Sequence, residues 1–332
     1  MRIGLALPQF DFSVPGEWPL QWDTVLGWAR RAEALGFESL WLADHLFFDL
    51  SRHGGPARLA GVLDPLPALG GLARGTSRAR LGTLVLCAPL RPPGVVASAL
   101  ATADVLSGGR VVAGVGAGWY EPEFLAAGVP FRPPAARLTH LAEYVTVLRA
   151  MFGGGPVTFS GEYVSVVDAP RLPRPVQVPS PPTWIGGRGT ALLAVVARVA
   201  DGWNTAWTST PQAYRERAEV LDRACERVGR DPSTVTRSLG LAALVGEHDD
   251  DLRGRFERLA ELSPPGLLEG TTLDEWGRGR LVGTVEQVRE QLETWAAVGV
   301  DELIVTMGAV PFAVGADDDL EIVAAACSLE AP

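Results

Sequence analysis

Residues able to do chemistry gather where short apolar runs of this 332-residue chain end. The run at 39–45 ends in Asp44 and His45, a carboxylate next to one of only four histidines. An imidazole accepts or donates a proton near neutral pH, which makes His45 a candidate catalytic acid or base. The same pair could instead cap the loop that follows, and position alone favours neither role.

Glycines follow two further apolar runs: Gly114, Gly116 and Gly118 in RVVAGVGAGW, and Gly186 and Gly187 in WIGGRGT. The second pair precedes Arg188 and the predicted start of a helix. Free amides, a helix N-terminus and a guanidinium together suit a phosphate group. A dinucleotide fingerprint would require glycine where the chain has Trp119, so the two turns predict a phosphorylated ligand that is not a dinucleotide.

Composition excludes several kinds of chemistry. All 29 basic residues are arginine, so the chain has no lysine for a Schiff base or a P-loop. Among the histidines only His45 ends a strand, which is too few for a catalytic metal site, and the three cysteines lack paired spacing. A net charge of −10 argues against nucleic acid and anionic membranes as partners. We expect a small-molecule partner and no metal.

Apolar runs alternate with helical patterns from one end of the chain to the other. Near-continuous apolar runs are typical of parallel strands buried on both faces, and helices between them form the crossovers. Eight strands are predicted, at 2–8, 39–45, 80–88, 110–118, 182–187, 202–207, 236–245 and 301–307. The pattern predicts an α/β fold, a single (β/α)8 TIM barrel. A doubly wound sheet is the competing architecture, but no Rossmann fingerprint supports it.

The chain is longer than a barrel requires, which is about 250 residues, so the surplus predicts loop insertions. We assign residues 1–332 to one barrel domain with insertions near 46–63, 153–181 and 247–282, the second holding a hairpin at PVTFSGEYVSVV. No stretch approaches the ~20 apolar residues of a membrane span. The first residues run directly into a strand, which is too short for a signal peptide, so we expect a cytoplasmic protein.

Five stretches, in order along nearly the whole chain, carry a resemblance to a known family. They are AEALGFESLWLADHL, RLGTLVLCAPLRPPGVVASALATADVLSGGRVVAGVGAGW, GEYVSVVDAPRLPRPVQ, PPTWIGGRGTALLAVVARVADGWN and LVGTVEQVREQLETWAAVGVDELIV. Together they resemble the bacterial luciferase-like monooxygenase superfamily, and within it the oxidoreductases that depend on the deazaflavin coenzyme F420. The resemblance implies a (β/α)8 barrel, F420 as cofactor, and hydride transfer between F420 and a small organic substrate.

The resemblance also assigns roles to residues at the strand ends. His45 matches the histidine that lies near the reactive carbon of the cofactor ring, and the family's non-proline cis peptide would fall at Leu84–Val85. The residues expected to contact the cofactor are Asp44, Thr83, Leu84, Val85, Ala117, Gly118, Trp119, Gly186, Gly187 and Arg188. The glycines would then hold the phosphate of a flavin-type tail. Relatives are frequently dimers, so a homodimer is expected.

Departures from the family pattern concern the substrate. Sugar-phosphate dehydrogenases of this branch carry a glutamate where this chain has Trp119, and they use lysines that it lacks. Their loop tryptophan is absent from HLFFDL, which offers Phe47 and Phe48 to a substrate. Trp203, in the sixth strand, is a further candidate for the substrate site, although a tryptophan there also suits the core. We therefore expect a substrate more apolar than a sugar phosphate.

Two other functions fit the same fold and residues. One is an FMN-dependent monooxygenase supplied with reduced flavin, since no residue pattern separates the two cofactors. The other is a barrel that binds a flavin or deazaflavin without catalysis, as a carrier or sensor. A sugar-phosphate isomerase or lyase is disfavoured because the chain has no lysine.

Overall fold

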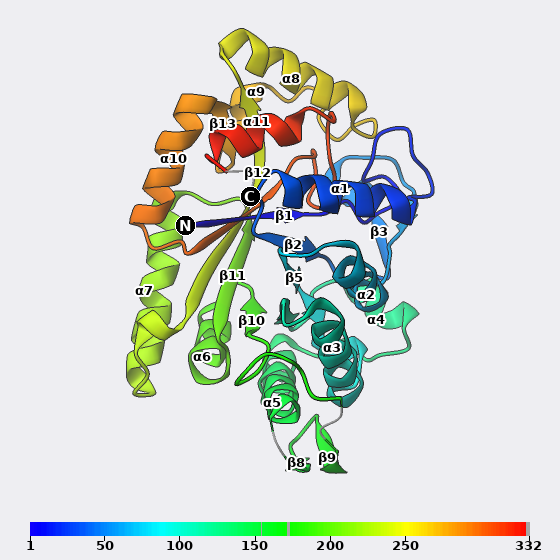
Figure 1. Ribbon diagram of the computed structural model, residues 1–332, viewed down its shortest axis with the longest axis vertical. Helices are drawn as coiled ribbons and strands as arrows, with labels where there is room; N and C mark the ends of the chain where they lie inside the picture. The colour runs from blue at the N-terminus through cyan, green and yellow to red at the C-terminus, as the bar shows by residue number, and fades with distance from the viewer. Residues whose placement is uncertain (154, 171–172, 330–332) are drawn as a thin grey trace.

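Eight parallel strands close on themselves in the computed structural model, which describes residues 1–153, 155–170 and 173–329 (Figure 1). In their order around the barrel they are β1 (Arg2–Ala6), β2 (Ser39–Leu42), β5 (Arg80–Thr83), β7 (Val111–Gly116), β10 (Thr183–Gly186), β11 (Gly202–Trp207), β12 (Thr236–Gly246) and β14 (Glu302–Thr306). The pairings of β10 with β7 and of β1 with β14 complete the ring. The predicted (β/α)8 barrel is confirmed, and the doubly wound alternative is excluded.

The third strand is interrupted near its C-terminal end. It pairs with β2 as far as Thr83 and with β7 as far as Gly82. The chain then passes through Leu84 and Val85 before β6 (Leu86–Cys87) resumes the pairing with β7. The peptide bond between Leu84 and Val85 is cis. The prediction for this bond is therefore confirmed. The interruption moves Leu84 and Val85 out of the regular ladder at the rim of the barrel.

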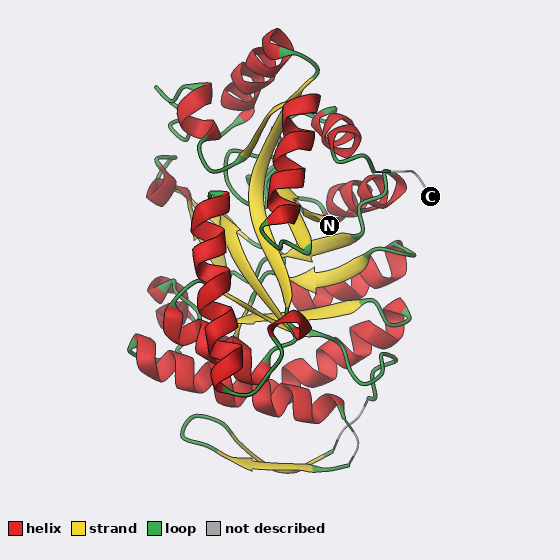
Figure 2. Ribbon diagram, turned by 90° about the vertical axis from the view of Figure 1, so that its left-hand side faces the viewer, coloured by secondary structure: helices red, strands yellow, loops and turns green. Residues whose placement is uncertain are grey.

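Helices cover the outside of the barrel (Figure 2). They are α1 (Trp22–Ala34), α2 (Pro65–Gly75), α3 (Pro93–Ser107), α5 (Pro134–Phe152), α6 (Thr190–Val199), α7 (Pro211–Arg227), α10 (Val285–Ala297) and α11 (Asp319–Ala326). Side chains cap the starts of two of these helices: Thr210 caps α7, and Thr284 with Gln287 forms a capping box on α10. Each helix turns one apolar face to the strands; in α7 this face includes Tyr214, Ala218 and Leu221.

Glycines inside the barrel make room for two tryptophans. Trp41 and Trp184 stack in the interior with ring centroids 5.0 Å apart. A Cβ on Gly82 would lie 2.2 Å from the ring of Trp41, and one on Gly202 would lie 2.4 Å from that of Trp184. Gly82 is therefore a packing residue, because any side chain there would displace the Trp41 ring.

Several elements lie outside the eight strand–helix units: the hairpin of β3 (Phe47–Asp49) and β4 (Leu59–Gly61) with η1 (Leu50–His53) between them, η2 (Ala88–Leu90), α4 (Glu121–Ala126), the hairpin of β8 (Val157–Ser160) and β9 (Ser165–Ala169), η3 (Pro232–Thr234), α8 (Asp249–Leu262), α9 (Leu273–Gly277) and β13 (Leu281–Thr284). Residues 154 and 171–172 of the predicted insertion at 153–181 lie outside the described residues. The assignment of 1–332 to one domain stays a prediction.

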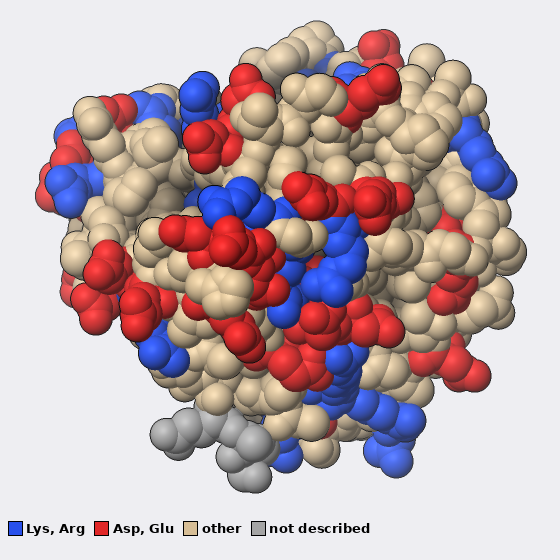
Figure 3. Space-filling model, turned by 90° about the horizontal axis from the view of Figure 1, so that it is seen from above, with Lys and Arg blue, Asp and Glu red and all other residues tan. Residues whose placement is uncertain are grey.

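The surface mixes charges of both signs. Figure 3 shows acidic and basic side chains side by side on the face seen from above. In the part of the chain that the structure describes, no helix has both the length and the apolar character needed to cross a membrane.

Candidate active site

A cavity of about 480 Å³ opens at the carboxyl ends of the strands. Its wall comes from residues that end or follow β1, β2, β5, β7, β10, β11 and β14. This is the end of a (β/α)8 barrel at which loops from many strands converge and where active sites are built. The cavity is therefore the candidate active site.

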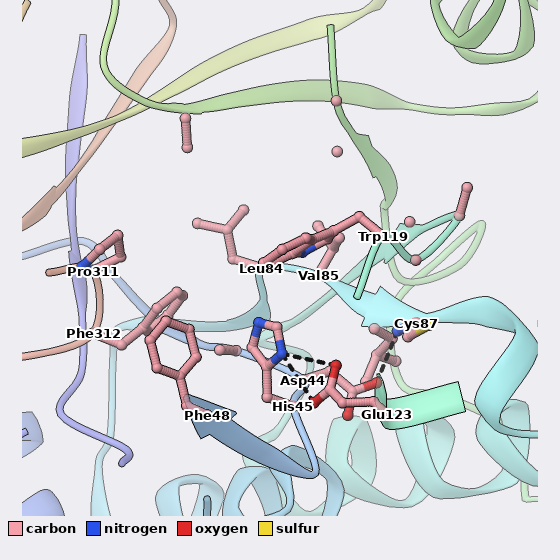
Figure 4. Close-up of a pocket in the computed structure, with 18 of the residues that line it drawn as sticks. Asp44, His45, Phe48, Leu84, Val85, Cys87, Trp119, Glu123, Pro311 and Phe312 are labelled. Atoms are coloured by element: carbon pink, nitrogen blue, oxygen red, sulfur yellow. Dashed lines mark hydrogen bonds and ion pairs between the residues drawn. The ribbon is translucent and has the colours of Figure 1, made fainter. Parts of the chain in front are cut away.

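Most of the residues predicted for the site line this cavity (Figure 4). They are Asp44, His45, Phe48, Leu84, Val85, Ala117, Gly118, Trp119, Gly186 and Gly187. Segments far apart in the sequence are thus brought to one space by the closure of the barrel. Whether these residues touch a cofactor or a substrate stays a prediction.

Trp203 and Thr83 are not on the cavity wall, which corrects two predictions. Trp203 is fully buried outside the barrel; its ring stacks on Tyr214 of α7 at 5.3 Å, and its indole N–H donates to the Gly187 carbonyl at 2.6 Å. Thr83 is fully buried, and its hydroxyl donates to the Gly114 carbonyl at 2.8 Å. Both side chains hold neighbouring backbone in place instead of facing a ligand.

Phe47 and Arg188 also lie off the wall. Phe47 packs edge-on against Tyr120 at 5.9 Å, so its ring supports the loop and does not line the cavity as predicted. Arg188 is exposed on the turn between β10 and α6. It could meet only a part of a ligand that extends beyond the cavity, so its role stays a prediction.

His45 forms an ion pair or hydrogen bond with a residue that the sequence did not single out. Its Nδ1 lies 3.0 Å from both carboxylate oxygens of Glu123, on α4, and Glu123 also accepts the Leu46 amide at 2.6 Å. Glu123 is buried, with 4% of its surface exposed. Figure 4 shows this contact at the bottom of the cavity, with the second ring nitrogen of His45 on the side away from Glu123.

Asp44 is held by a buried charged network. Its Oδ2 accepts the Cys87 amide at 2.8 Å and the Arg91 guanidinium at 2.6 Å, and Arg91 also binds Asp64 at 2.7 Å. Burial raises the pKa of Asp44 above its ordinary value, while Arg91 acts in the opposite direction. Its other oxygen, Oδ1, is buried and has no hydrogen-bond partner. Such an orphaned acceptor beside a cavity is suited to a donor from a ligand.

Val85 forms part of the cavity floor and explains two of the glycines. A Cβ on Gly116 would lie 2.6 Å from the Val85 side chain, and one on Gly186 would lie 2.9 Å from it. A Cβ on Gly114 would lie 1.9 Å from the Thr83 carbonyl oxygen. These three glycines allow the interrupted third strand to approach β7 and β10. Packing against Thr83 and Val85 thus accounts for Gly114 and Gly116, and their role in holding a phosphate stays a prediction.

One side of the cavity is a cluster of aromatic rings, which we call the aromatic end: Phe10, Phe48, Trp207 and Phe312. Phe10 lies 5.0 Å from Phe48 and 6.3 Å from Phe312, whose ring meets Trp207 edge-on at 5.2 Å. Pro311 completes this side. None of the described residues that line the cavity is an arginine.

The β3–β4 hairpin reaches across to the turn after β7. The guanidinium of Arg52 lies over the rings of Trp119, at 5.5 Å, and Tyr120, at 4.8 Å. Phe48 stacks on His53 at 5.3 Å. Partial desolvation of its ring and the nearby Arg52 charge lower the pKa of His53.

Some cavity residues that were not predicted lie at or just after the ends of predicted strands, where the active site of a (β/α)8 barrel is expected. Trp207 is the last residue of the predicted sixth strand, and Pro311 and Phe312 follow the eighth. Both Ala206 and Trp207 line the cavity, so strand alternation does not hold at this end, where the joining peptide bond is cis. Glu123 comes from a short helix after the strand; its only signal is an acid set among apolar residues in EPEFLA.

Comparisons with known proteins agree with this architecture. Residues 1–302 match a family model described as luciferase-like monooxygenase. The F420-dependent glucose-6-phosphate dehydrogenase of Microbacterium testaceum (strain StLB037) is 37% identical over 215 residues, which cover 64% of this chain and 61% of that enzyme. The matched part is thus less than two thirds of that relative's length.

Two further similarities cover more of the chain. An uncharacterized protein of Mycobacterium tuberculosis (strain ATCC 25618 / H37Rv) is 33% identical over 253 residues, 73% of this chain and 85% of that one. The structure of the coenzyme F420-dependent tetrahydromethanopterin reductase from Methanopyrus kandleri superposes with a TM-score of 0.75 at 20% identity, covering 98% of both chains. The latter similarity shows a shared fold.

Proposed function

Because the chain belongs to the luciferase-like monooxygenase family, we propose that it is an oxidoreductase that uses the deazaflavin coenzyme F420. The proposed reaction is hydride exchange between F420 and a small, uncharged and largely apolar organic substrate. The cofactor assignment is supported by similarity to F420-dependent enzymes, among them the glucose-6-phosphate dehydrogenase of Microbacterium testaceum. The substrate class rests on the cavity itself.

The residues of the cavity fit a flat ring system with one polar edge. Leu84, Val85 and Leu86 give an apolar floor, and Asp44 offers a buried oxygen without a partner. The backbone at Gly118 and Gly187 lies on the same wall without side chains. When bound, the deazaflavin supplies the two-electron hydride chemistry, and the protein supplies position and electrostatics.

Cofactor contacts are proposed for the cavity-lining residues of the predicted set: Asp44, Leu84, Val85, Ala117, Gly118, Trp119, Gly186 and Gly187. Arg188 lies just before the N-terminus of α6, outside the cavity wall. A phosphate on a tail that leaves the cavity there would meet both the helix dipole and the guanidinium.

His45 is the proposed catalytic residue because it is the imidazole at the base of the cavity. It exchanges one proton with the oxygen of the substrate. Phe48 and Trp119 flank its ring edge-on, at 5.7 and 5.9 Å. They limit the access of water to that proton.

The observation that carries the substrate class is the absence of a cationic side chain from the described lining of the cavity. A sugar phosphate needs charge-assisted hydrogen bonds to its phosphate. The aromatic end offers apolar surface instead, from Phe10, Phe48, Trp207 and Phe312. An uncharged alcohol or carbonyl compound with an apolar body fits this side of the cavity.

Direct binding followed by single turnover tests the proposal. The protein is titrated with F420 and separately with FMN, and the complex is mixed with uncharged secondary alcohols or with glucose 6-phosphate. We expect F420 to bind at least about tenfold more tightly than FMN, and the absorbance of oxidised F420 to fall with an alcohol but not with the sugar phosphate. Tighter FMN binding would favour the monooxygenase, and F420 binding without any redox change would favour a carrier.

The proposal extends to assembly and location. A homodimer and a cytoplasmic location follow from the sequence resemblance. Light scattering of the purified chain tests the first, since a dimer would have twice the mass of 35.2 kDa. A monomer at all concentrations would contradict it.

A further inference from the structure

Glu123 is a buried carboxylate whose hydrogen-bond contacts are all with His45 and Leu46 among the described residues. Both of its oxygens lie 3.0 Å from the His45 Nδ1, one of them accepts the Leu46 amide, and no arginine is paired with it among the described residues. Burying a carboxylate is unfavourable unless its oxygens are well bonded. An acid that served only to join α4 to the loop after β2 would need no imidazole. The contact with His45 is therefore a candidate functional feature.

Aromatic rings surround the imidazole of His45 on its other sides. Phe10, Phe48, Trp119 and Tyr120 have ring centroids between 5.7 and 6.5 Å from it. Among the described residues, no hydrogen bond joins any of these four side chains to the imidazole, whose side-chain contacts of that kind are both with Glu123. Among the described side chains, Glu123 is thus the polar partner of this ring, and the low polarity around the pair strengthens their interaction.

We propose that Glu123 is the positioning residue of His45: it accepts the Nδ1 proton, fixes the neutral ring in that tautomer and leaves the Nε2 lone pair facing the cavity. The Nδ1–H tautomer of His45 is inferred from the contact with Glu123. The catalytic part rests on the proposed function. A carboxylate that orients an imidazole and stabilises its protonated form is a recurrent catalytic arrangement on unrelated folds.

The proton balance follows from this tautomer. When the substrate is an alcohol, its O–H bond would break as an Nε2–H bond forms. The carbon that bears the hydroxyl would lose its hydride and become a carbonyl carbon, and a bound, oxidised deazaflavin would supply the two-electron acceptor. The imidazolium that results lies against the Glu123 carboxylate, so no isolated charge is created in the aromatic surroundings. In the reverse direction the same proton returns from Nε2 to the carbonyl oxygen.

Nitrogen NMR of the imidazole rings tests the tautomer without cofactor or substrate. With only four histidines in the chain, His45 can be assigned by comparing ¹⁵N-histidine spectra of the wild type and H45A. We expect His45 to show the Nδ1–H tautomer in the wild type and in E123Q, which keeps an acceptor oxygen, and a mixture of tautomers in E123A. The exposed Glu121 on the same helix provides the control, E121Q.

Kinetics on the same variants test the catalytic part. E123A should lower kcat by about 10- to 100-fold with less than about a threefold change in F420 affinity, and E123Q should lose less. The double variant H45A/E123A should be no slower than H45A, because the two residues act as one unit. Circular dichroism establishes that each variant is folded; E123Q keeps the inference testable if E123A is not.

The outcomes separate the two proposals. An unchanged tautomer in folded E123A, or losses that simply multiply in the double variant, would overturn the role of Glu123. Failure of F420 to bind the wild type, with the Nδ1–H tautomer present and lost in E123A, would instead refute the proposed function and leave the positioning of His45 by Glu123 intact.

Discussion

His45 meets Glu123 through one ring nitrogen and lines the cavity with the rest of its ring. Replacing it by alanine removes the proposed proton exchange but leaves the floor and the glycine wall unchanged. We expect H45A to lower kcat by about 100-fold while F420 affinity changes by less than about threefold. Steady-state rates and a fluorescence titration measure the two effects.

His53 provides the matched control for that substitution. It also lines the cavity, but it is exposed at the mouth and stacks on Phe48. H53A should therefore keep most of its turnover. If H53A lowered kcat as much as H45A does, the proposed proton exchange could not be assigned to His45 alone.

At the scale of elements, the rim depends on the fit of Val85 between β7 and β10. G116A places a Cβ 2.6 Å from the Val85 side chain, which lines the cavity and must shift to make room. We expect G116A to lose about 1–3 kcal/mol of unfolding free energy and to bind F420 more weakly. Chemical denaturation and titration measure these losses.

Gly189, on the turn before α6, is the control for G116A. A Cβ there meets no atom within 4 Å, and its φ of −69° suits alanine. G189A should change stability by less than about 0.5 kcal/mol. Equal effects of the two substitutions would show that the fit around Val85 is not what Gly116 provides.

Glu33 of α1 ties that helix to the start of β5. Its carboxylate accepts the backbone amides of Ser77, Arg78 and Ala79, at 2.6 to 3.0 Å. Burial alone would raise the pKa of Glu33, but these amides lower it overall, below its ordinary 4.5. The resulting stabilisation is present above pH 4.5 and is lost as the pH falls through the lowered pKa.

E33Q should therefore reduce the unfolding free energy by about 1–2 kcal/mol near neutral pH. The difference from the wild type should shrink as the pH is lowered below 4.5. Urea unfolding at a series of pH values measures it, with exposed Glu38 as the control in E38Q. A difference that does not change with pH would contradict the role of the charge.

The positions of the elements were predictable because buried parallel strands and capped helices leave strong local signals. The capping box of Thr284 and Gln287, for example, is visible in the sequence as a spacing of three. The reason for Gly116 was not predictable, because it depends on Val85, which lies 31 positions earlier and reaches β7 only through the interrupted third strand.

Side-chain direction was the second limit. Trp203 and Trp207 belong to the same strand, yet the first packs on α7 and the second lines the cavity. Both are tryptophans in the same apolar run, so the sequence did not show that their side chains point to different sides of the strand. Glu123 was missed because its partner, His45, lies 78 positions away; only the closed barrel brings the two together.

At the scale of the whole molecule, the cavity exists only when the barrel is closed, since its wall is shared among the ends of β1, β2, β5, β7, β10, β11 and β14. A ligand of the cavity should therefore bind the native state alone. F420 at 100 times its Kd should add about 2.7 kcal/mol to the unfolding free energy. The expected rise in Tm is a few degrees.

Thermal melts with and without F420 measure this coupling. H45A should show the same rise as the wild type, because His45 is proposed to serve turnover more than affinity. FMN at the same concentration is the comparison. An unchanged Tm at this F420 concentration would contradict binding of F420 to the native state alone.

Val85 has a consequence for related sequences. Residues 85, 116 and 186 lie on three neighbouring segments of the wall, and the valine occupies space that side chains at the two glycine positions would need. A homologue with alanine at either glycine position should carry a smaller residue at the valine position. Residues at these three positions should covary in an alignment of homologues. A homologue with valine at the position of Val85 and glycine at both of the other positions should have the same rim geometry.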